Sequence, residues 1–468
     1  MAKTTASIRP KSPRFPLQCF AATGALPLFQ RGEPLIRAFA AFLLLTAMFR
    51  PQAFASDQSK TVITLSQAVK EALENNPELK SLREGALAGM ERAKTEGYLD
   101  DPVLRVMLEE IPKDKPFNIT PGNAMATRYT LSQMLPYPGK LGLKQGIASK
   151  EALLLKARLT ALELEKVFMA KEAYYDYAYS SLSLNIMNEI REVLSYMGKV
   201  AESKYAAGTA TQQDVIKLNL EVSLASSEII SLATERSIAE ARLKAVMYRP
   251  LDETLPDPPN PPLTQGGDWG AIPSNAVELK ADEVLKTTVD ATTDLQMALL
   301  EAEGAALSKE LAEKNYYPDF MVGAGPVQRD GEVTGFDVMF QMNIPVWFGK
   351  YRGLSEASGK ELSSQRLRLA SIRNTKTLEI MEAVLQLRAA LETRTLYDTT
   401  LVKQASLSFE SALKNYQSGK GDLLMLLDAE RELKKIRLAA LRAAAGYWKK
   451  AAALEKAAGT GIIATTGK

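Results

Sequence analysis

The sequence contains no histidine and only one cysteine, Cys19. Without histidine, the Ser-His-Asp and Cys-His nucleophile systems and the commonest zinc sites are excluded. A single thiol allows neither a disulfide within the chain nor a two-cysteine redox or metal motif. Carboxylates are abundant, but none lies in a recognisable catalytic context, and no cofactor motif occurs. We therefore expect no enzyme activity, no cofactor and no resident metal.

Large rings and long apolar runs are also scarce. Aromatic residues make up 7% of the 468 residues, so small apolar side chains must do most of the packing. No run reaches the roughly 18 apolar residues that a membrane-spanning helix needs. With 46% hydrophobic and 24% charged residues, the chain can still bury a substantial core, which excludes disorder of the whole chain.

The first 55 residues have the pattern of a secretory signal peptide. The short apolar run Ala38–Phe49 is flanked by Arg37 and Arg50 and is followed by an Ala-x-Ala cleavage site at 53–55. Residues 1–55 carry seven Lys or Arg and one acid, so their removal changes the formal net charge from +3 to −3. The basic balance therefore gives no reason to expect a nucleic-acid partner, and we expect an exported chain.

The rest of the chain contains a near-duplication about 210 residues apart. Gln133–Lys140, which reads QMLPYPGK, returns as Gln341–Lys350, which reads QMNIPVWFGK. Tyr205–Gly208 returns as Tyr416–Gly419, both with the pattern Tyr-x-x-Gly. The order of these motifs is preserved with only small insertions. We therefore expect a tandem repeat.

A Pro-rich segment separates the two repeats. Seven prolines lie between Arg249 and Pro273, and this density excludes a regular helix. The predicted domains are a signal peptide at 1–55, a first repeat at 56–248, a Pro-rich linker at 249–275, a second repeat at 276–459 and a C-terminal tail at 460–468.

Each repeat reads as a helix, a strand pair, a very long helix, a tight turn and a long helix. Apolar and polar residues alternate at 104–109, 129–132 and 336–344. With the stretch 320–327, this predicts four strands of about ten residues, long enough to cross a membrane when tilted. A pair of soluble hairpins would show the same alternation. We expect Arg105, Glu109, Asp337 and Gln341 to face a lumen, and Leu104, Val106, Leu108 and Val338 to face lipid.

The helical part of each repeat has the pattern of an antiparallel coiled coil. No proline interrupts Leu141–Lys204, so one very long helix is expected. The helix after it shows 3,4-spaced apolar residues from Val215 to Val246, and the second repeat shows them from Leu426 to Tyr447, as in coiled coils. Gly208 and Gly419 stand where the periodicity breaks, and we expect left-handed turn conformations there.

Four strands cannot close into a barrel, because closure needs at least about eight. An open sheet edge in a bilayer would leave backbone groups without hydrogen-bond partners. If the strands lie in a membrane, the protein must therefore be an oligomer in which each chain contributes four strands. The helices would then extend the same tube away from the membrane and form a conduit.

Together, the signal peptide, the tandem repeat, the strand pair before each long helix and the Tyr-x-x-Gly turns resemble the TolC-like outer-membrane efflux proteins. The resemblance implies a mainly α fold with a membrane β-barrel, formed as a homotrimer with a periplasmic α-barrel and an equatorial region at the linker. It implies a passive exit duct in the outer membrane that extends into the periplasm. Its partners would be outer-membrane lipid, a periplasmic adaptor protein and an inner-membrane efflux transporter.

The stretch Gln133–Lys140 resembles the branch of the family that serves heavy-metal efflux through resistance-nodulation-division transporters. That branch implies metal cations as the transported substrate. A member that exports drugs or proteins fits the other features equally well. A soluble periplasmic coiled-coil scaffold is a further alternative, and it would require the strands to lie outside a membrane.

The resemblance also implies two kinds of site. The helical turns would form the inner tip of the duct and dock the adaptor, through Gly208, Thr209, Gly419 and Lys420. Acidic residues shortly after the second turn would line a constriction, and the matching positions here are Met425 and Asp428, of which only Asp428 is acidic. The predicted gate is therefore Asp428, with Asp214 bracing the neighbouring turn.

Overall fold

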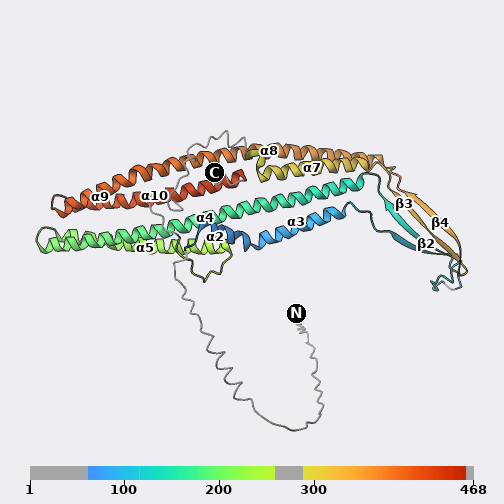
Figure 1. Ribbon diagram of the computed structural model, residues 1–468, viewed down its shortest axis with the longest axis horizontal. Helices are drawn as coiled ribbons and strands as arrows, with labels where there is room; N and C mark the ends of the chain where they lie inside the picture. The colour runs from blue at the N-terminus through green and yellow to red at the C-terminus, as the bar shows by residue number, and fades with distance from the viewer. Residues whose placement is uncertain (1–61, 115, 259–287, 460–468) are drawn as a thin grey trace, which may run out of the picture. The chain divides into compact units, whose positions relative to one another are not determined.

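The computed structural model describes residues 62–114, 116–258 and 288–459 (Figure 1). The chain divides into the units Met1–Ser59 and Lys60–Lys468, and every described residue belongs to the second unit. The predicted signal peptide, the predicted C-terminal tail and most of the predicted Pro-rich linker lie outside the described residues.

Both repeats contain the predicted order of elements. The first comprises α2 (Leu65–Glu74), α3 (Pro77–Thr95), β1 (Val103–Glu109), β2 (Ala126–Leu135), α4 (Lys140–Ala206) and α5 (Gln212–Met247). The second comprises the short helix η2 (Val289–Ala291), then α7 (Thr293–Lys314), β3 (Phe320–Arg329), β4 (Glu332–Met342), α8 (Phe348–Leu396), η3 (Tyr397–Leu401), α9 (Val402–Gln417) and α10 (Leu423–Ala458).

The proline-free segment forms one continuous helix, α4, of 67 residues, which corresponds to about 100 Å at the helical rise per residue. The prediction of about ten residues for each strand was wrong for β1, which has seven. Its end has a local cause, because Glu110 adopts a φ of 54° and so leaves the extended conformation.

The four strands form one antiparallel sheet in the order β1-β2-β3-β4. The β2–β3 pairing joins the two repeats, with Ser132 opposite Gly323 and Leu131 opposite Ala324. This pair of strands depends on a glycine: a Cβ at Gly325 would lie 1.5 Å from the carbonyl oxygen of Tyr129. The sheet can therefore form in this register only with glycine at position 325.

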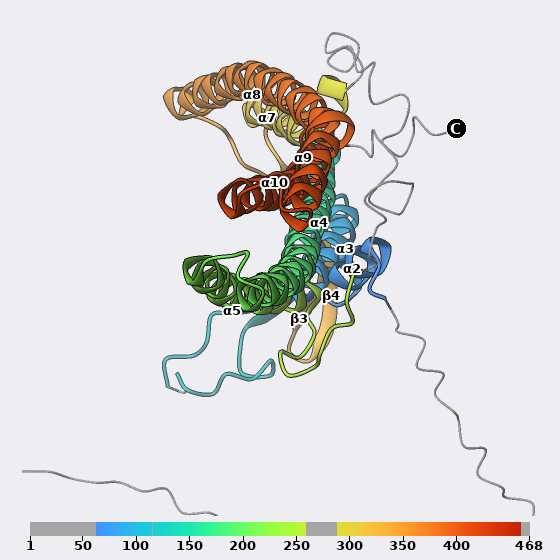
Figure 2. The same ribbon diagram turned by 90° about the vertical axis from the view of Figure 1, so that its left-hand side faces the viewer.

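The helices pack as two antiparallel hairpins, α4 with α5 and α8–α9 with α10 (Figure 1). Leu218 and Ala225 of α5 and Leu426 of α10 are buried, as the 3,4 spacing predicted. The four helices share one apolar cluster near the turns, which also contains Leu182, Ile186, Met187, Ile190, Leu194, Met197, Ala201, Tyr416, Leu423, Leu427 and Leu441. Seen end on, the helices of this unit lie along an arc, with α8 at one end and α5 at the other (Figure 2).

None of the described helices combines the length and the apolar character that crossing a membrane would require.

The long helix of the second repeat is interrupted by a π-helical turn, η3, between α8 and α9. The sequence explains the presence of this turn, because the long helical segment has one more residue in the second repeat: Gly139 and Gly208 are 69 residues apart, whereas Gly349 and Gly419 are 70 apart. A π-helical turn takes up one extra residue without ending a helix. We infer that η3 absorbs a single-residue insertion and keeps the turn at Gly419 in step with the turn at Gly208.

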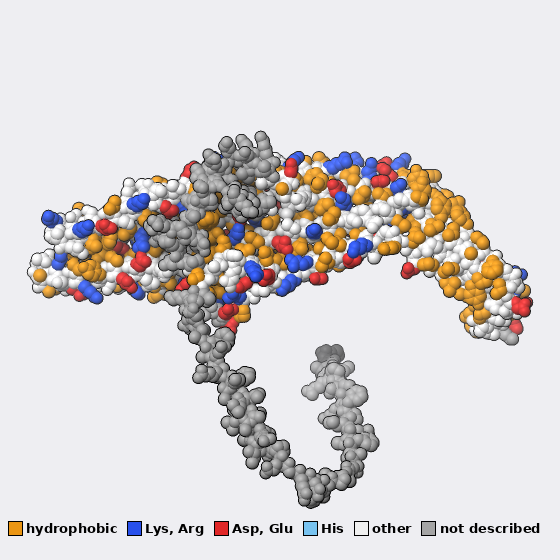
Figure 3. All heavy atoms as spheres, viewed as in Figure 1, with side chains coloured by type: hydrophobic (Ala, Val, Ile, Leu, Met, Phe, Trp, Pro, Cys, Tyr) orange, Lys and Arg blue, Asp and Glu red, His pale blue; other side chains and the backbone are white. Residues whose placement is uncertain are grey.

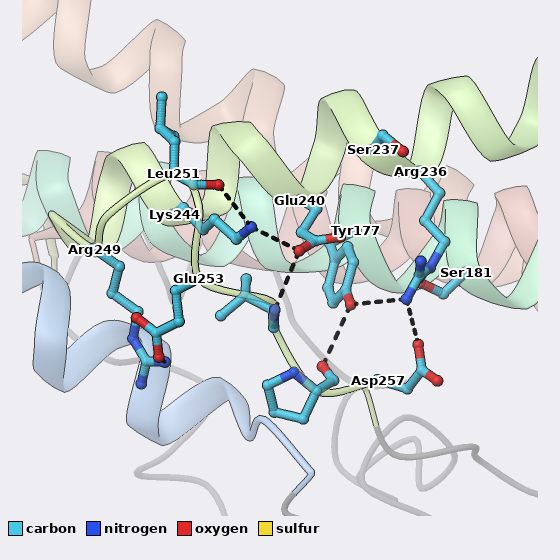
Figure 4. Close-up of polar contacts among 12 residues, drawn as sticks. Tyr177, Ser181, Arg236, Ser237, Glu240, Lys244, Arg249, Leu251, Glu253 and Asp257 are labelled. Carbon is cyan, nitrogen blue, oxygen red and sulfur yellow. Dashed lines mark hydrogen bonds and ion pairs between the residues drawn. The ribbon is translucent and has the colours of Figure 1, made fainter.

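The described start of the Pro-rich linker contains no helix and folds back on α4 and α5 (Figure 4). The guanidinium of Arg236 donates to a carboxylate oxygen of Asp257 at 2.6 Å and to the Tyr177 hydroxyl at 3.3 Å. The backbone N–H of Leu255 donates to Oε1 of Glu240 at 3.1 Å. These contacts fasten the linker to the side of the first hairpin, where Tyr177 is fully buried.

Candidate functional site

The two faces of the sheet differ in chemistry. The register places Arg105, Glu109, Asp337 and Gln341 on one face, and Leu104, Val106, Leu108 and Val338 on the other. This is the partition that the alternation predicted. On the second face, side chains remain exposed although they are large and apolar: Leu104 is 64% exposed and Val338 85%. Figure 3 shows hydrophobic side chains gathered over the strands.

An exposed apolar surface of this kind marks contact with lipid or with another protein. We call it the apolar sheet face: it contains Leu104, Val106, Leu108, Leu131, Val322, Phe336, Val338, Phe340 and Met342. Phe320 and Phe340 pair across it, with ring centroids 5.9 Å apart.

The opposite, polar face of the sheet carries an ionic cluster that the sequence analysis missed. The Nε atom of Arg128, on β2, lies 2.6 Å from Oε1 of Glu109 on β1. The same guanidinium also donates to the carboxylate of Asp337 on β4. Arg128 follows the alternation of β2, so its face could have been predicted, but its reach to both outer strands depends on the order of the strands.

Between the strands and the long helices, the two near-duplicated motifs take different roles. The motif of the first repeat packs against the second repeat through Tyr137 and Lys140. The ammonium of Lys140, whose side chain is 6% exposed, lies 2.9 Å from a carboxylate oxygen of Asp319. Tyr137 stacks on Tyr317 with ring centroids 4.4 Å apart. In the second repeat, by contrast, Trp347 and Phe348 are 74% and 69% exposed.

Both helical turns have the predicted left-handed glycine, with φ of 71° at Gly208 and 76° at Gly419. The backbone N–H of Thr209 donates to the carbonyl of Lys204 at 2.8 Å, and the N–H of Lys420 donates to the carbonyl of Asn415 at 2.9 Å. This bond closes each helix end in the same way. An added side chain at either glycine would meet open space, so only the backbone conformation requires glycine.

The two turns touch through one lysine and one tyrosine. The ammonium of Lys204, at the end of α4, donates to the carbonyl oxygen of Tyr416 and lies 4.4 Å from the centroid of its ring. The side chain of Tyr416 is buried, and this burial raises the pKa of its hydroxyl, with Asp214 and Asp422 adding to the effect. The contact between the ammonium of Lys204 and the buried ring of Tyr416 thus holds the two turns together.

The two predicted gate residues have separate local roles. Asp214 and Thr211 form a capping box at the start of α5, with the Thr211 N–H donating to Asp214 Oδ2 at 3.0 Å. Asp214 therefore caps the first turn of α5. The side chain of Asp428 on α10 is 77% exposed, and its Oδ1 lies 3.8 Å from a guanidinium nitrogen of Arg431.

A buried carboxylate next to this position was not predicted. Glu430 on α10 is 4% exposed, and its Oε1 has no hydrogen-bond partner in the described part of the chain. Its pKa is raised to about 7, chiefly by burial, and the nearby carboxylates Glu221 and Glu228 of α5 contribute to the rise. Lys434 and Arg431 oppose the rise and also bridge the two hairpins, through Lys434–Glu228 at 3.1 Å and Arg431–Glu221.

Comparisons with known proteins agree with this geometry. Residues 285–460 match the model of the family described as outer membrane efflux protein. The structure of CusC superposes with a TM-score of 0.69 at 15% identity, covering 86% of this chain and 93% of CusC. VceC of Vibrio cholerae gives 0.67 at 17% identity, covering 85% and 96%. MtrE of Neisseria gonorrhoeae gives 0.66 at 17% identity, covering 85% and 89%.

At these identities the superpositions show a shared fold. No curated protein sequence matches the chain.

The chain therefore shares the fold of the outer membrane protein VceC and the outer membrane channel MtrE, with a two-sided antiparallel sheet joined to paired helical hairpins. The family match covers residues 285–460, so the second repeat is similar to the outer membrane efflux proteins.

Proposed function

We propose that three copies of this chain close one tube, which serves as the outer-membrane exit duct of a tripartite efflux pump. The observation that carries the proposal is the sheet. It has one exposed apolar face and one polar face, and within the described residues β1 and β4 each pair with a single strand. In a bilayer both outer edges must be paired, and four strands are too few to close alone.

The stoichiometry is testable by native mass measurement of the gently solubilised protein. We expect a trimer, and a monomer would contradict the proposal. Single cysteines at Asp337 and Val338 then test the faces with a water-soluble thiol reagent. Labelling at 337 should exceed labelling at 338, because Asp337 lies on the polar face and Val338 on the apolar sheet face. The reverse order would place lipid on the wrong side of the sheet.

The proposed pump also needs a periplasmic adaptor protein and an inner-membrane transporter. We assign adaptor docking to the turns at Gly208–Thr209 and Gly419–Lys420, where both glycines are open to solvent and both backbones are closed by their own hydrogen bonds. These turns therefore present their outer surface to a partner without needing it for folding.

Gly419→Asp should abolish efflux while trimer yield stays nearly normal. The matched variant is Gly419→Asn, because asparagine tolerates the left-handed conformation and adds no charge. Gly85→Asp adds the same charge at an α3 position that is open to solvent, and efflux should survive it. Equal loss of folded trimer and efflux in Gly419→Asp would show that the turn is only a helix stop.

We further assign Asp428 to closing or cation selectivity at the inner end of the duct. Three copies of an exposed carboxylate around an axis attract cations, and repulsion between them favours opening, whereas pairing with Arg431 opposes it. Asp428→Ala should change the resting single-channel conductance or reduce block by divalent and trivalent cations. Unchanged values for both would remove Asp428 from the gate.

For the substrate we propose heavy-metal cations, on the resemblance of Gln133–Lys140 to the metal-efflux branch. The described contacts of this motif join the two repeats, through Lys140 and Asp319, so the motif identifies the branch and does not bind the substrate. A strain without this chain should become sensitive to heavy-metal salts. Sensitivity to drugs with unchanged metal tolerance would instead assign the chain to drug export.

A further inference from the structure

The β4–α8 junction presents large apolar side chains to the surface. Ile344, Val346, Trp347 and Phe348 are 68%, 57%, 74% and 69% exposed. The corresponding junction of the first repeat instead contacts the second repeat, through Tyr137 and Lys140. The difference follows from the strand order: β2 has a neighbour on both sides, whereas β4 is an edge strand.

A second exposed apolar pair lies at the other edge of the sheet. Tyr98 and Leu99, which precede β1, are 74% and 46% exposed. The register places this pair at the same height as the β4–α8 junction. Val103 at the start of β1 is opposite Ser132 near the end of β2. Across the next two strand pairs, the end of β2 is opposite Phe320 of β3, and Phe320 is opposite Met342 at the end of β4.

The two edges also carry opposite charges next to these side chains. Asp100 and Asp101 follow Tyr98 and Leu99, and both are exposed. Lys350 and Arg352 follow Phe348, and both are exposed as well. Apolar residues next to acidic residues at the β1 edge are therefore complementary in charge to apolar residues next to basic residues at the β4 edge.

We propose that these edges form an intersubunit clasp, in which Trp347 and Phe348 of one chain pack on Tyr98 and Leu99 of the next copy of this chain. Asp100 and Asp101 then face Lys350 and Arg352 across the same contact. The inference rests on the closed trimer proposed above, because only closure brings β4 of one chain beside β1 of another. A head-to-tail contact of this kind closes a ring when the rotation fits.

The clasp gives the ring a contact outside the bilayer-spanning strands. Aromatic side chains bury large areas and dominate the energetics of interfaces. The charge match sets the register between neighbouring edges, since like charges would meet if a chain docked the wrong way round. The two copies of the repeated motif thus have different contacts. The copy in the first repeat joins the two repeats, and the copy in the second repeat joins neighbouring chains.

Disulfide crosslinking tests the clasp directly, because the chain has no cysteine other than Cys19. In a Cys19→Ser background, Leu99→Cys with Phe348→Cys should give linked dimers and trimers on a non-reducing gel after mild oxidation. The matched control is Leu99→Cys with Val338→Cys, because Val338 lies in mid-strand on the apolar sheet face. The control pair should give no linked species.

Charge reversal provides a second readout. Asp100→Lys with Asp101→Lys should lower the temperature at which the trimer dissociates in detergent. Adding Lys350→Glu and Arg352→Glu should restore it. Rescue requires the two pairs to face each other, so a general loss of folding cannot produce it.

The outcomes separate this proposal from the proposed function. A trimer by native mass that gives neither crosslinks nor charge rescue overturns the clasp and leaves the duct intact. A monomer overturns both. A link within a single chain also overturns the clasp. Strong quenching of Trp347 fluorescence by brominated lipids, measured with the other tryptophans replaced by phenylalanine and accompanied by no crosslinks, would assign this surface to lipid instead.

Discussion

Glu430 is expected to make the contact between the two helical hairpins sensitive to pH. Its carboxyl group is 4% exposed, and burial raises its pKa from 4.5 to about 7. Moving α10 away from α5 would return the group to water and to its ordinary pKa. A raised carboxyl pKa means that the packed arrangement is favoured at low pH, where the group is neutral in both states. The packed arrangement loses that advantage as the pH rises through 7.

The size of the effect follows from the two pKa values. Each unit is equivalent to about 1.4 kcal/mol, so the change from 4.5 to about 7 corresponds to about 3 kcal/mol per chain above neutral pH. Most of this change falls between pH 5 and pH 8, over which the opening equilibrium should shift by about 2 to 3 kcal/mol, or on the order of tens of fold.

Amide hydrogen exchange measures the opening. In peptides that cover 423–440, protection corrected for the intrinsic exchange rate should fall steeply between pH 5 and pH 8. Glu430→Gln keeps the shape of the side chain and removes its titration, so its protection should stay nearly constant. The matched control is Glu432→Gln on the same helix, where the side chain is 56% exposed and lies 3.6 Å from Lys435. This control should behave like the wild type.

The reasoning is refuted if the wild type and Glu430→Gln show the same dependence on pH. It is also refuted if protection rises with pH in the wild type, because that sign would require a lowered carboxyl pKa.

Two further predictions concern the sheet. Gly325→Ala should prevent correct assembly, because the new Cβ would lie 1.5 Å from a backbone oxygen of β2, whereas Gly335→Ala meets open space and should be tolerated. The heat-dependent mobility of the trimer on SDS gels reports this, and normal assembly of Gly325→Ala would contradict the β2–β3 register. Arg128→Met should leave Glu109 and Asp337 without their shared cation and so increase cation selectivity, measured as the reversal potential in a salt gradient. An unchanged potential would mean that this polar face does not line the pore.

Much of the helical architecture could be predicted from the sequence because it depends on local periodicity. The absence of proline from 141 to 204 allowed α4 to run uninterrupted, and the 3,4 spacing identified buried positions such as Leu218 and Leu426. The glycine turns were predictable for the same reason, since a positive φ at Gly208 and Gly419 is a local requirement. Even the two faces of the sheet followed from alternation alone.

The candidate site depended more on contacts between distant residues. Glu430 adjoins the predicted apolar positions of α10 and was not singled out from the sequence, yet α5 of the other hairpin brings Glu221 and Glu228 close to it. Asp428, which the resemblance suggested, is the exposed neighbour. Periodicity assigns a residue to one side of its own helix, but it does not say which other helix covers that side.

What the sequence determined by itself is therefore the set of elements, their order, their turns and the polarity of each face, because these follow from backbone preferences and from spacing along one chain. Only the tertiary structure decided which copy of a repeated motif packs against the other repeat. Tyr137 follows β2, which has a strand on each side, and it stacks on Tyr317, whereas Trp347 follows the edge strand β4 and remains exposed. The two motifs share a pattern in the sequence, and their surroundings differ because strand order gives one of them a neighbour that the other lacks.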